Sequence, residues 1–342
     1  MTVGKEIKAY SYEGIGELMK QWGQPRFRAK QVVQWLYQKG VSSYDEMSNL
    51  PASLRERLQN EAPLLPAEVI DRRVSKDGTR KYVVRFHDGC ATEMVAIPSR
   101  DRLTVCFSTQ VGCAMGCVFC ATGKEGFTRN LLPGEMVEQV LIAQEDMGAR
   151  VTNLVGMGQG EPFLNYDNTM AALRLFNAAD GMNIGARKIT VSTCGVLPGI
   201  KKFASEPEQF TLAVSLHSAI QFSRDVLMPT VANQRLTDLK KALQAYQGES
   251  GRRITFEYIM IDGVNDDEEH LHALMSFCRG LSCHVNLIPI NAVDGSLFQP
   301  SADATVAMFL EGLERRGIEA TLRASRGSDI AGACGQLKNL GR

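Results

Sequence analysis

Three cysteines that lie close together are the residues of this chain best suited to chemistry. Cys113, Cys117 and Cys120 have a CxxxCxxC spacing within one short segment. Thiolates are the ligands that soft metals and iron–sulfur clusters prefer. A structural zinc site needs a fourth ligand and usually has CxxC pairs, which are not adjacent here. Three cysteines on a cubic 4Fe–4S cluster would leave one iron free to bind a substrate or cofactor. A non-catalytic zinc loop is the alternative.

A glycine-rich segment, residues 156–161, follows a predicted strand and reads Gly-Met-Gly-Gln-Gly-Glu. A dinucleotide-binding loop should open directly into a helix. Here Pro162 follows at once, and Glu161 places a negative charge where a phosphate would bind. We therefore expect an ammonium group, rather than a phosphate, beside Glu161.

Further candidates end other predicted strands. Ser192 and residues 215–217 (Ser-Leu-His) are small or polar groups that suit contacts with a ribose or a carboxylate. Cys106 ends a predicted strand, and Cys334 lies in a loop of small residues. Taken alone, each of these two thiols would be interpreted as a buried structural cysteine.

These residues must be positioned by the strands and helices that alternate from about residue 102 onward. The predicted strands are 103–108, 151–155, 187–192, 210–215, 253–260, 284–289 and 318–323. The predicted helices are 134–147, 167–178, 235–247, 267–278 and 302–316. Such alternation indicates a parallel sheet with crossover helices, either open or curled into a barrel. Active residues should then lie at the carboxyl ends of the strands.

The first hundred residues have a different pattern. Residues 1–62 are predicted to be helical, with a helix over residues 52–60, and residues 67–98 are predicted to form a β-ribbon. Residues 71–85 hold six basic side chains against two acidic ones. A solvated ribbon and a strip that contacts phosphates are both consistent with that excess.

Composition excludes several classes of protein. The 342 residues include 38 Lys and Arg and 38 Asp and Glu, so the formal net charge is zero, which argues against indiscriminate, charge-driven binding to nucleic acid. No apolar run approaches the ~18 residues of a membrane span, and the first residues lack the apolar core of a signal peptide. We expect a cytoplasmic protein without a membrane segment, in which cysteines act as ligands or catalytic thiols.

The motifs together resemble a known family. A CxxxCxxC loop after a first barrel strand resembles the radical S-adenosylmethionine (SAM) superfamily, and the surrounding residues resemble the RlmN/Cfr family of RNA methyltransferases within it. The resemblance covers nearly the whole chain, in order. It rests on Arg26–Gln31, Asn49–Pro51, Cys106–Cys113, Ala121–Gly123, Gly126–Asn130, Gly158–Pro162, Thr190–Thr193, Ser215–His217, Asn286–Pro289 with Asn291, and Ala333–Leu337.

The resemblance implies a fold and a domain organisation. The fold is α/β, a partial (β/α)6 TIM-like radical SAM barrel with a small N-terminal helical accessory domain. Residues 1–62 would form the accessory, RNA-binding domain. Residues 63–100 would form a linker and β-ribbon extension, and residues 101–342 the radical SAM core with its C-terminal catalytic-cysteine loop.

The cofactors implied by the resemblance are one 4Fe–4S cluster and SAM, two molecules of which are used per turnover. Cys113, Cys117 and Cys120 would ligate the cluster. The residues that would contact SAM are Gly160, Glu161, Ser192, Ser215, Leu216 (through its backbone), His217 and Asn291.

The resemblance also assigns a methyl relay. One SAM would methylate Cys334 by displacement, and a radical made from a second SAM would remove hydrogen from that S-methyl group. The resulting carbon radical would add to an adenine ring of the RNA. Cys106 would resolve the protein–RNA adduct through a transient disulfide with Cys334. Glu93 is the implied proton acceptor, with Cys106 able to share that task.

The implied substrate is an adenosine of the peptidyl-transferase centre in 23S rRNA, together with the adenosine 3′ of the anticodon in some tRNAs. Residues 326–329 before the Cys334 loop favour the RlmN branch, which methylates carbon 2, over the Cfr branch, which methylates carbon 8. We expect a monomer that receives electrons from a donor such as flavodoxin. A radical SAM enzyme for small molecules or proteins, and a non-catalytic iron–sulfur or zinc RNA-binding module, are the other hypotheses.

The remaining cysteines and four of the histidines are expected to be structural. Cys278, Cys283 and His284 could imitate a metal cluster, but they span a predicted helix end and strand start, where packing is the simpler explanation. This group consists of Cys90, Cys194, Cys278, Cys283, His87, His270, His272 and His284.

Overall fold

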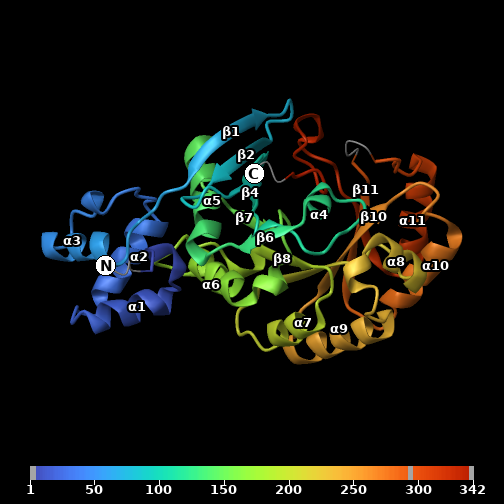
Figure 1. The fold of residues 1–342 in the computed structure, drawn as a ribbon. Helices are drawn as coiled ribbons and strands as arrows, with labels where there is room; N and C mark the ends of the chain where they lie inside the picture. Colours follow the sequence, from blue (N-terminus) through green and yellow to red (C-terminus); the bar gives the residue numbers. More distant parts are fainter. Residues whose placement is uncertain (1–4, 292–295, 339–342) are drawn as a thin grey trace.

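The computed structural model describes residues 5–291 and 296–338. A helical N-terminal domain lies at one end, and a curved sheet with helices around it forms the rest (Figure 1). Within the described residues, one ten-stranded sheet runs from edge to edge without closing. Its spatial order is β1 (Glu68–Val74), β2 (Arg80–Arg85), β3 (Ala91–Ser99), β4 (Arg102–Cys106), β7 (Asn153–Gly156), β8 (Ile189–Thr193), β9 (Thr211–Ser215), β10 (Ile254–Met260), β11 (Cys283–Pro289) and β12 (Glu319–Leu322).

Within this sheet the seven strands β4, β7, β8, β9, β10, β11 and β12 are all parallel, as expected of a partial barrel. β5 (Gln110–Gly112) and β6 (Phe127–Asn130) form a separate antiparallel pair. Each of the seven predicted strands is present, which confirms the α/β barrel-like fold. A (β/α)6 barrel has six parallel strands, and β12 is a seventh one at the open edge of the sheet. The long crossover helices are α5 (Pro133–Met147), α6 (Tyr166–Asn177), α9 (Leu236–Ser250), α10 (Glu268–Cys278) and α11 (Asp303–Arg315). Three shorter helices were not predicted, because one or two turns give too little periodicity: α4 (Ala121–Glu125), α7 (Leu197–Ala204) and α8 (Gln221–Leu227).

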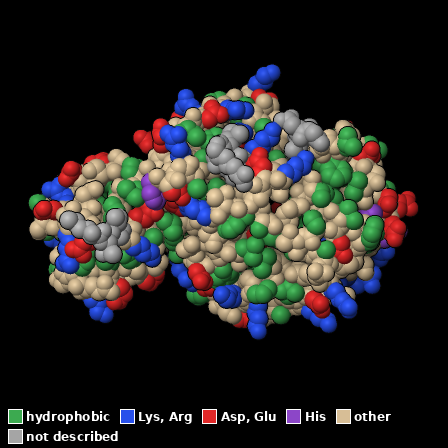
Figure 2. All heavy atoms as spheres, viewed as in Figure 1, with side chains coloured by type: hydrophobic (Ala, Val, Ile, Leu, Met, Phe, Trp, Pro, Cys, Tyr) green, Lys and Arg blue, Asp and Glu red, His purple; other side chains and the backbone are tan. Residues whose placement is uncertain are grey.

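The predicted ribbon consists of three antiparallel strands that continue the barrel sheet, because β3 pairs with β4. All of its six basic residues except Lys76 form ion pairs within the protein. The pairs are Arg72 and Arg80 with Asp146, Arg73 with Asp71, Lys81 with Glu93, and Arg85 with Glu68. Basic and acidic side chains are also interspersed over the visible face in Figure 2. The ribbon is therefore largely charge-balanced by its own protein.

The N-terminal domain is built from α1 (Tyr12–Gln21), α2 (Phe27–Tyr37) and α3 (Ala52–Glu61). Its apolar residues, such as Met19, Val33 and Leu58, are fully buried and belong to the same continuous core cluster as the barrel. Asp180, after α6, pairs with Lys30 and accepts a hydrogen bond from Tyr12. None of the helices in the described part of the chain is long and apolar enough to cross a membrane.

After β12 the chain turns back towards the ribbon (Figure 1), and Cys334 in this segment lines the cavities at the carboxyl ends of the strands. Two carboxylates fasten this segment to the turn between β1 and β2. Asp77 Oδ2 accepts a hydrogen bond from the Gly327 N–H at 3.1 Å. Asp329 accepts from the Ser75 hydroxyl at 2.6 Å and from the Lys76 N–H at 3.2 Å. The ribbon thus supports the loop that carries Cys334.

The hydrogen bonds of Asp77 predict that the attachment of this segment depends on pH. Burial acts to raise the pKa of Asp77, but hydrogen bonds from Thr79, Gly327 and Ser75 lower it to about 2. A carboxyl group with a lowered pKa stabilises the fold above its ordinary pKa of 3.8, and this contribution is lost as the pH falls towards 2. Asp77→Asn should release the segment at neutral pH, seen as faster hydrogen exchange of the Gly327 amide.

The matched control is Asp71→Asn, since Asp71 lies on the same ribbon but is bound only to exposed Arg73. Exchange at Gly327 that is equally slow in both variants at neutral pH would show that Asp77 does not hold the segment.

Candidate active site

The carboxyl ends of the parallel strands surround a cavity of about 150 Å³. Nine of the predicted site residues line it: Cys113, Cys117, Cys120, Gly160, Glu161, Ser192, Ser215, His217 and Cys334. A second cavity of about 210 Å³ shares part of this lining and holds Cys106, Cys334 and Asn291. The structure therefore brings eleven predicted residues to one end of the barrel, as the strand-end argument requires.

The three-cysteine loop is held by backbone hydrogen bonds at each end. The Cys113 N–H donates to the Gly126 carbonyl at 2.9 Å, and the Ala121 N–H, directly after Cys120, donates to the Gly335 carbonyl at 2.8 Å. Burial raises the pKa of the Cys113 thiol to about 12 and also raises that of Cys120. Such thiols ionise when a metal replaces their protons. Three thiols facing one cavity fit an iron–sulfur cluster with one open iron.

Glu161 is a buried carboxylate that lines the first cavity. Its Oε1 accepts the Phe163 N–H at 3.0 Å and its Oε2 accepts the Cys194 N–H at 2.7 Å. Within the described residues no cationic side chain pairs with it, and burial raises its pKa. A buried anion that lacks a cation is costly. The site therefore fits a ligand that brings an ammonium group.

The glycines before Glu161 let the backbone approach the strand end closely. A Cβ on Gly158 would lie 2.6 Å from Ser108 Oγ, and one on Gly160 would lie 2.6 Å from Gln110 Cβ. Gly160 also has a φ of +102°, a conformation that favours glycine. Other residues at these positions would push the loop away from the cavity.

Ser192, Ser215 and His217 lie on one wall of the same cavity. The two serine Oγ atoms are 3.4 Å apart. His217 Nδ1 accepts the Ile259 N–H at 3.1 Å, and burial, together with the charge of Arg224, lowers the His217 pKa to about 3. Its imidazole is therefore neutral at physiological pH. Leu216 is fully buried, and its N–H donates to the Glu257 carbonyl at 3.0 Å, so it does not line either cavity.

Cys106 and Cys334 lie together in the second cavity, although they are distant in sequence. Both are free thiols. Burial raises the pKa of Cys106 to about 12; negative charge on Cys334 adds to this effect and Arg323 opposes it. The pKa of Arg323 is raised, chiefly by Cys334, and its Nη1 lies 3.3 Å from Glu257 Oε2. Arg323 is therefore a cation that lines the same cavity as both thiols.

Asn291 and Glu93 both contact the C-terminal segment that carries Cys334. Asn291 Nδ2 donates to the Cys334 carbonyl at 3.2 Å, so it holds the cysteine loop. Glu93 is fully buried, pairs with Lys81 at 3.0 Å and accepts the Lys338 N–H at 2.6 Å. Burial raises its pKa, against the opposing charge of Lys81. Its side chain lines neither cavity.

Two residues beside the cysteine loop were not singled out in the sequence. The Cys194 thiol hydrogen-bonds to Cys117 and lines the first cavity, although Cys194 was expected to be only structural. Arg224, on α8, is fully buried; its Nη2 donates to the Cys194 carbonyl at 2.6 Å, while Nε and Nη1 have no hydrogen-bond partner. Burial lowers the pKa of Arg224, whereas negative charge at Cys194 and Cys117 acts to raise it. This incompletely paired cation fits an anionic cluster. The position of Cys194, just after the end of a strand, was the available signal.

Comparison with known proteins gives consistent matches over the chain. The family model of the radical SAM superfamily matches residues 107–275, and that of the ribosomal RNA large subunit methyltransferase N-terminal domain matches residues 6–64. The probable dual-specificity RNA methyltransferase RlmN of Clostridium novyi is 41% identical over 98% of both chains. That of Synechococcus elongatus is 47% identical over 92% of this chain and 88% of its own. The crystal structure of a radical SAM methyltransferase from Sphaerobacter thermophilus superposes with a TM-score of 0.92 at 44% identity, covering 98% and 99% of the two chains.

The buried Arg224 predicts a property of the bound cluster. Its positive charge stabilises the more negative, reduced state, so Arg224→Gln should lower the one-electron reduction potential. We expect a change on the order of 60 mV, which corresponds to tenfold in a one-electron equilibrium. Anaerobic redox titration monitored by electron paramagnetic resonance measures it.

Arg187→Gln, which changes an exposed residue in the turn before β8, is the control, and Arg224→Lys should restore most of the potential. Equal potentials in the wild type and in a cluster-replete Arg224→Gln variant would refute this electrostatic role.

Proposed function

The chain belongs to the RlmN family of radical SAM RNA methyltransferases, and from this membership we propose that it methylates carbon 2 of an adenosine in 23S rRNA, and of the adenosine 3′ of the anticodon in some tRNAs. Enzymes of this family use a 4Fe–4S cluster and SAM. The observation that carries the proposal is the pairing of Cys106 and Cys334 in a cavity that adjoins the three-cysteine loop.

In the proposed reaction, Cys113, Cys117 and Cys120 hold the cluster. Glu161, Ser192 and Ser215 would bind SAM, with the Glu161 carboxylate facing its ammonium group. The neutral His217 would add an uncharged polar contact. The Glu161 carboxylate is then the charged group that favours a ligand with an ammonium group. When bound, the cluster and SAM supply the radical that removes hydrogen from the methyl group on Cys334.

Cys334 acts first, as a nucleophile. Its thiolate takes the methyl group of SAM, so that a carbon–sulfur bond forms to Cys334 and the sulfonium carbon–sulfur bond breaks. Arg323 supports this step because its guanidinium stabilises negative charge on the Cys334 sulfur. Asn291 fixes the loop through the Cys334 carbonyl.

Cys106 acts last, on the adduct between Cys334 and the RNA. Its raised pKa keeps it a neutral thiol at physiological pH, so it does not compete for the methyl group of SAM. In the adduct, Cys106 would lose its proton to a base and attack the Cys334 sulfur, so that the disulfide forms and the bond from this sulfur to the bridging methylene carbon breaks. The released carbon takes up a proton and becomes the methyl group of the base. A two-electron reductant must then restore both thiols.

Proton removal from the adenine ring is assigned to Glu93 in this proposal. The carboxylate is held by Lys81 and by the Lys338 N–H, and Leu337, the residue before Lys338, lines the Cys334 cavity. Movement of the C-terminal segment as RNA enters would break the Lys338 contact and free a base whose pKa burial has raised. Cys106 is the alternative base.

The remaining parts of the proposal concern partners. We expect the protein to act as a monomer in the cytoplasm and to receive electrons from a flavodoxin-type donor. Residues 1–62 and the ribbon would position the RNA, and a flipped adenine would enter the barrel mouth.

Analysis of the modified nucleoside tests the function. Anaerobic holoenzyme with SAM, a reductant and 23S rRNA should yield 2-methyladenosine by mass spectrometry. Cys334→Ala should yield none, because no thiolate accepts the first methyl group. Cys283→Ala should remain active, because Cys283 begins β11 and so lies at the end of the strand away from the cavity. A product of 8-methyladenosine would overturn the carbon 2 assignment. No RNA methylation by cluster-loaded protein would favour a binding module.

Removal of the resolving thiol should trap the intermediate. Cys106→Ala is expected to accumulate a covalent protein–RNA adduct, visible as a shifted band on a denaturing gel. The Cys106→Ala/Cys334→Ala double variant should show none, since the adduct forms through Cys334. If Cys106→Ala released methylated RNA at the wild-type rate, the proposed resolving role of Cys106 would be wrong.

A further inference from the structure

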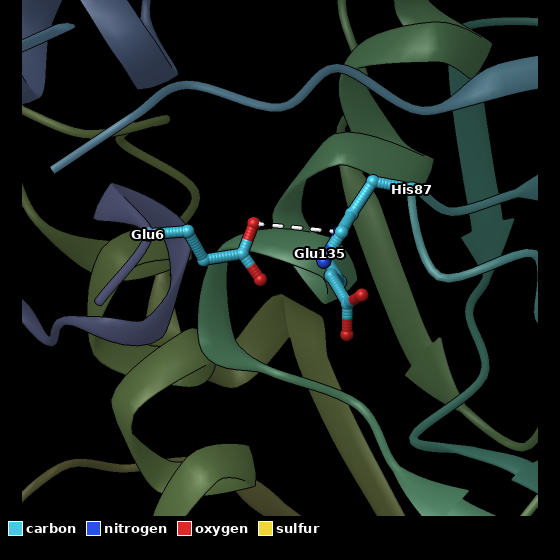
Figure 3. A group of neighbouring side chains, drawn as sticks. All are labelled: Glu6, His87 and Glu135. Atoms are coloured by element: carbon cyan, nitrogen blue, oxygen red, sulfur yellow. Dashed lines mark ion pairs between the residues drawn. The ribbon is translucent and has the colours of Figure 1, made fainter. Parts of the chain in front are cut away.

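Glu6, His87 and Glu135 form a cluster of potential metal ligands outside the barrel mouth. One ligand atom from each lies within 4.8 Å of the others. The three side chains converge from different parts of the fold, as Figure 3 shows. Glu6 precedes the first short helix of the N-terminal domain, His87 lies in the turn between β2 and β3, and Glu135 lies in the first turn of α5.

Glu6 shows that the cluster is incompletely paired. Its side chain is only 10% exposed, and its Oε2 accepts no hydrogen bond from the described residues. This oxygen points at His87, whose Nδ1 lies 3.7 Å away, too far for a hydrogen bond. Burial raises the pKa of Glu6, because the neighbouring groups do not fully replace the hydrogen bonds to water that the carboxylate loses.

Glu135 is held in a fixed orientation. Arg129 donates to both of its oxygens at 2.8 Å, and the Leu132 N–H donates to Oε2 at 2.7 Å. Oε1 accepts only the one bond from Arg129, so a lone pair of Oε1 remains for a metal. Arg129 also binds Asp88, beside His87, at 2.5 Å. The guanidinium thus orders two of the three segments without occupying every acceptor.

The side chains around the cluster carry a net negative charge that a divalent cation could balance. Glu6, Asp88 and Glu135 contribute three negative charges, and Arg129 contributes one positive charge. Nearby Lys8 is paired with Glu138 at 2.5 Å, so its charge is already balanced. A histidine binds zinc through its neutral imidazole, so two negative charges remain for a divalent cation to balance.

We propose that Glu6, His87 and Glu135 form a zinc site that fastens the N-terminal domain to the ribbon and to α5. An imidazole with two carboxylates is a ligand set that suits zinc, whereas calcium and magnesium prefer oxygen ligands alone. Water completes the tetrahedral shell. Because the site lies between three segments, bound zinc fixes the helical domain relative to the barrel mouth. The proposal does not depend on the chemistry at Cys334.

Zinc binding to the intact enzyme is the direct test. Full-length holoenzyme with its cluster, freed of loosely bound metal, is titrated with zinc chloride by calorimetry. We expect one zinc ion per chain in the wild type and at least tenfold weaker binding in His87→Ala and Glu6→Gln. His272→Ala, which removes an exposed histidine of α10, should bind as the wild type does. Equal affinity in all four proteins would overturn the site.

The identity of the ligands is the second measurement. X-ray absorption at the zinc edge should show only nitrogen and oxygen neighbours at about 2.0–2.2 Å, with the iron content unchanged. Sulfur neighbours at about 2.3 Å, or loss of iron as zinc binds, would assign the zinc to the cysteines and refute the proposal. If Glu6→Gln failed to fold, His87→Ala would still test the site, because the His87 side chain is 43% exposed and its loss should leave the fold intact.

Discussion

Cys334 stands on a segment without a long regular element, so its position opposite Cys106 depends on a few hydrogen bonds. The ribbon turn holds the segment at Gly327 and Asp329, and Asn291 holds the Cys334 carbonyl. Two further bonds join it to α4, from the Ala121 N–H to the Gly335 carbonyl and from the Thr122 hydroxyl to the Leu337 carbonyl at 2.7 Å. Because α4 starts directly after Cys120, the same bonds couple Cys334, the proposed methyl acceptor, to the three-cysteine loop.

Charges buried around the barrel mouth complement the proposed reaction. Glu161 has no cationic side chain as a partner among the described residues, and Arg224 has two nitrogens without hydrogen bonds. Isolated buried charges cost several kcal/mol (about 3–5 when a buried pair is broken), so they persist where a ligand completes them. An ammonium group and an anionic cluster would supply the two missing charges. Arg323, in contrast, is already balanced by Glu257 and can therefore stabilise a thiolate without binding it permanently.

The sequence predicted the parallel sheet, and it singled out the three-cysteine loop and the glycine-rich loop, because each depends on local patterns. Buried parallel strands have long apolar runs, and the three cysteines share one loop. The pairing of Cys106 with Cys334 came from family resemblance, since nothing local relates two thiols more than two hundred residues apart. Arg224 and the partners of Glu93 could not be foreseen. Their roles depend on long-range packing, which also converts the basic excess of residues 71–85 into internal ion pairs.

Acidic residues of α5 show how positive and negative charges of this chain are paired within the fold. This helix carries Asp146, which binds Arg72 and Arg80 of the ribbon, and Glu138, which binds Lys8 of the N-terminal region. Acidic groups on α5 thus neutralise cations that RNA could otherwise attract without specificity, and they fix the ribbon and the helical domain on one support. A rigid support of this kind favours recognition by shape over recognition by charge. The position of the N-terminal domain relative to the barrel mouth would then decide which adenosine can reach Cys334.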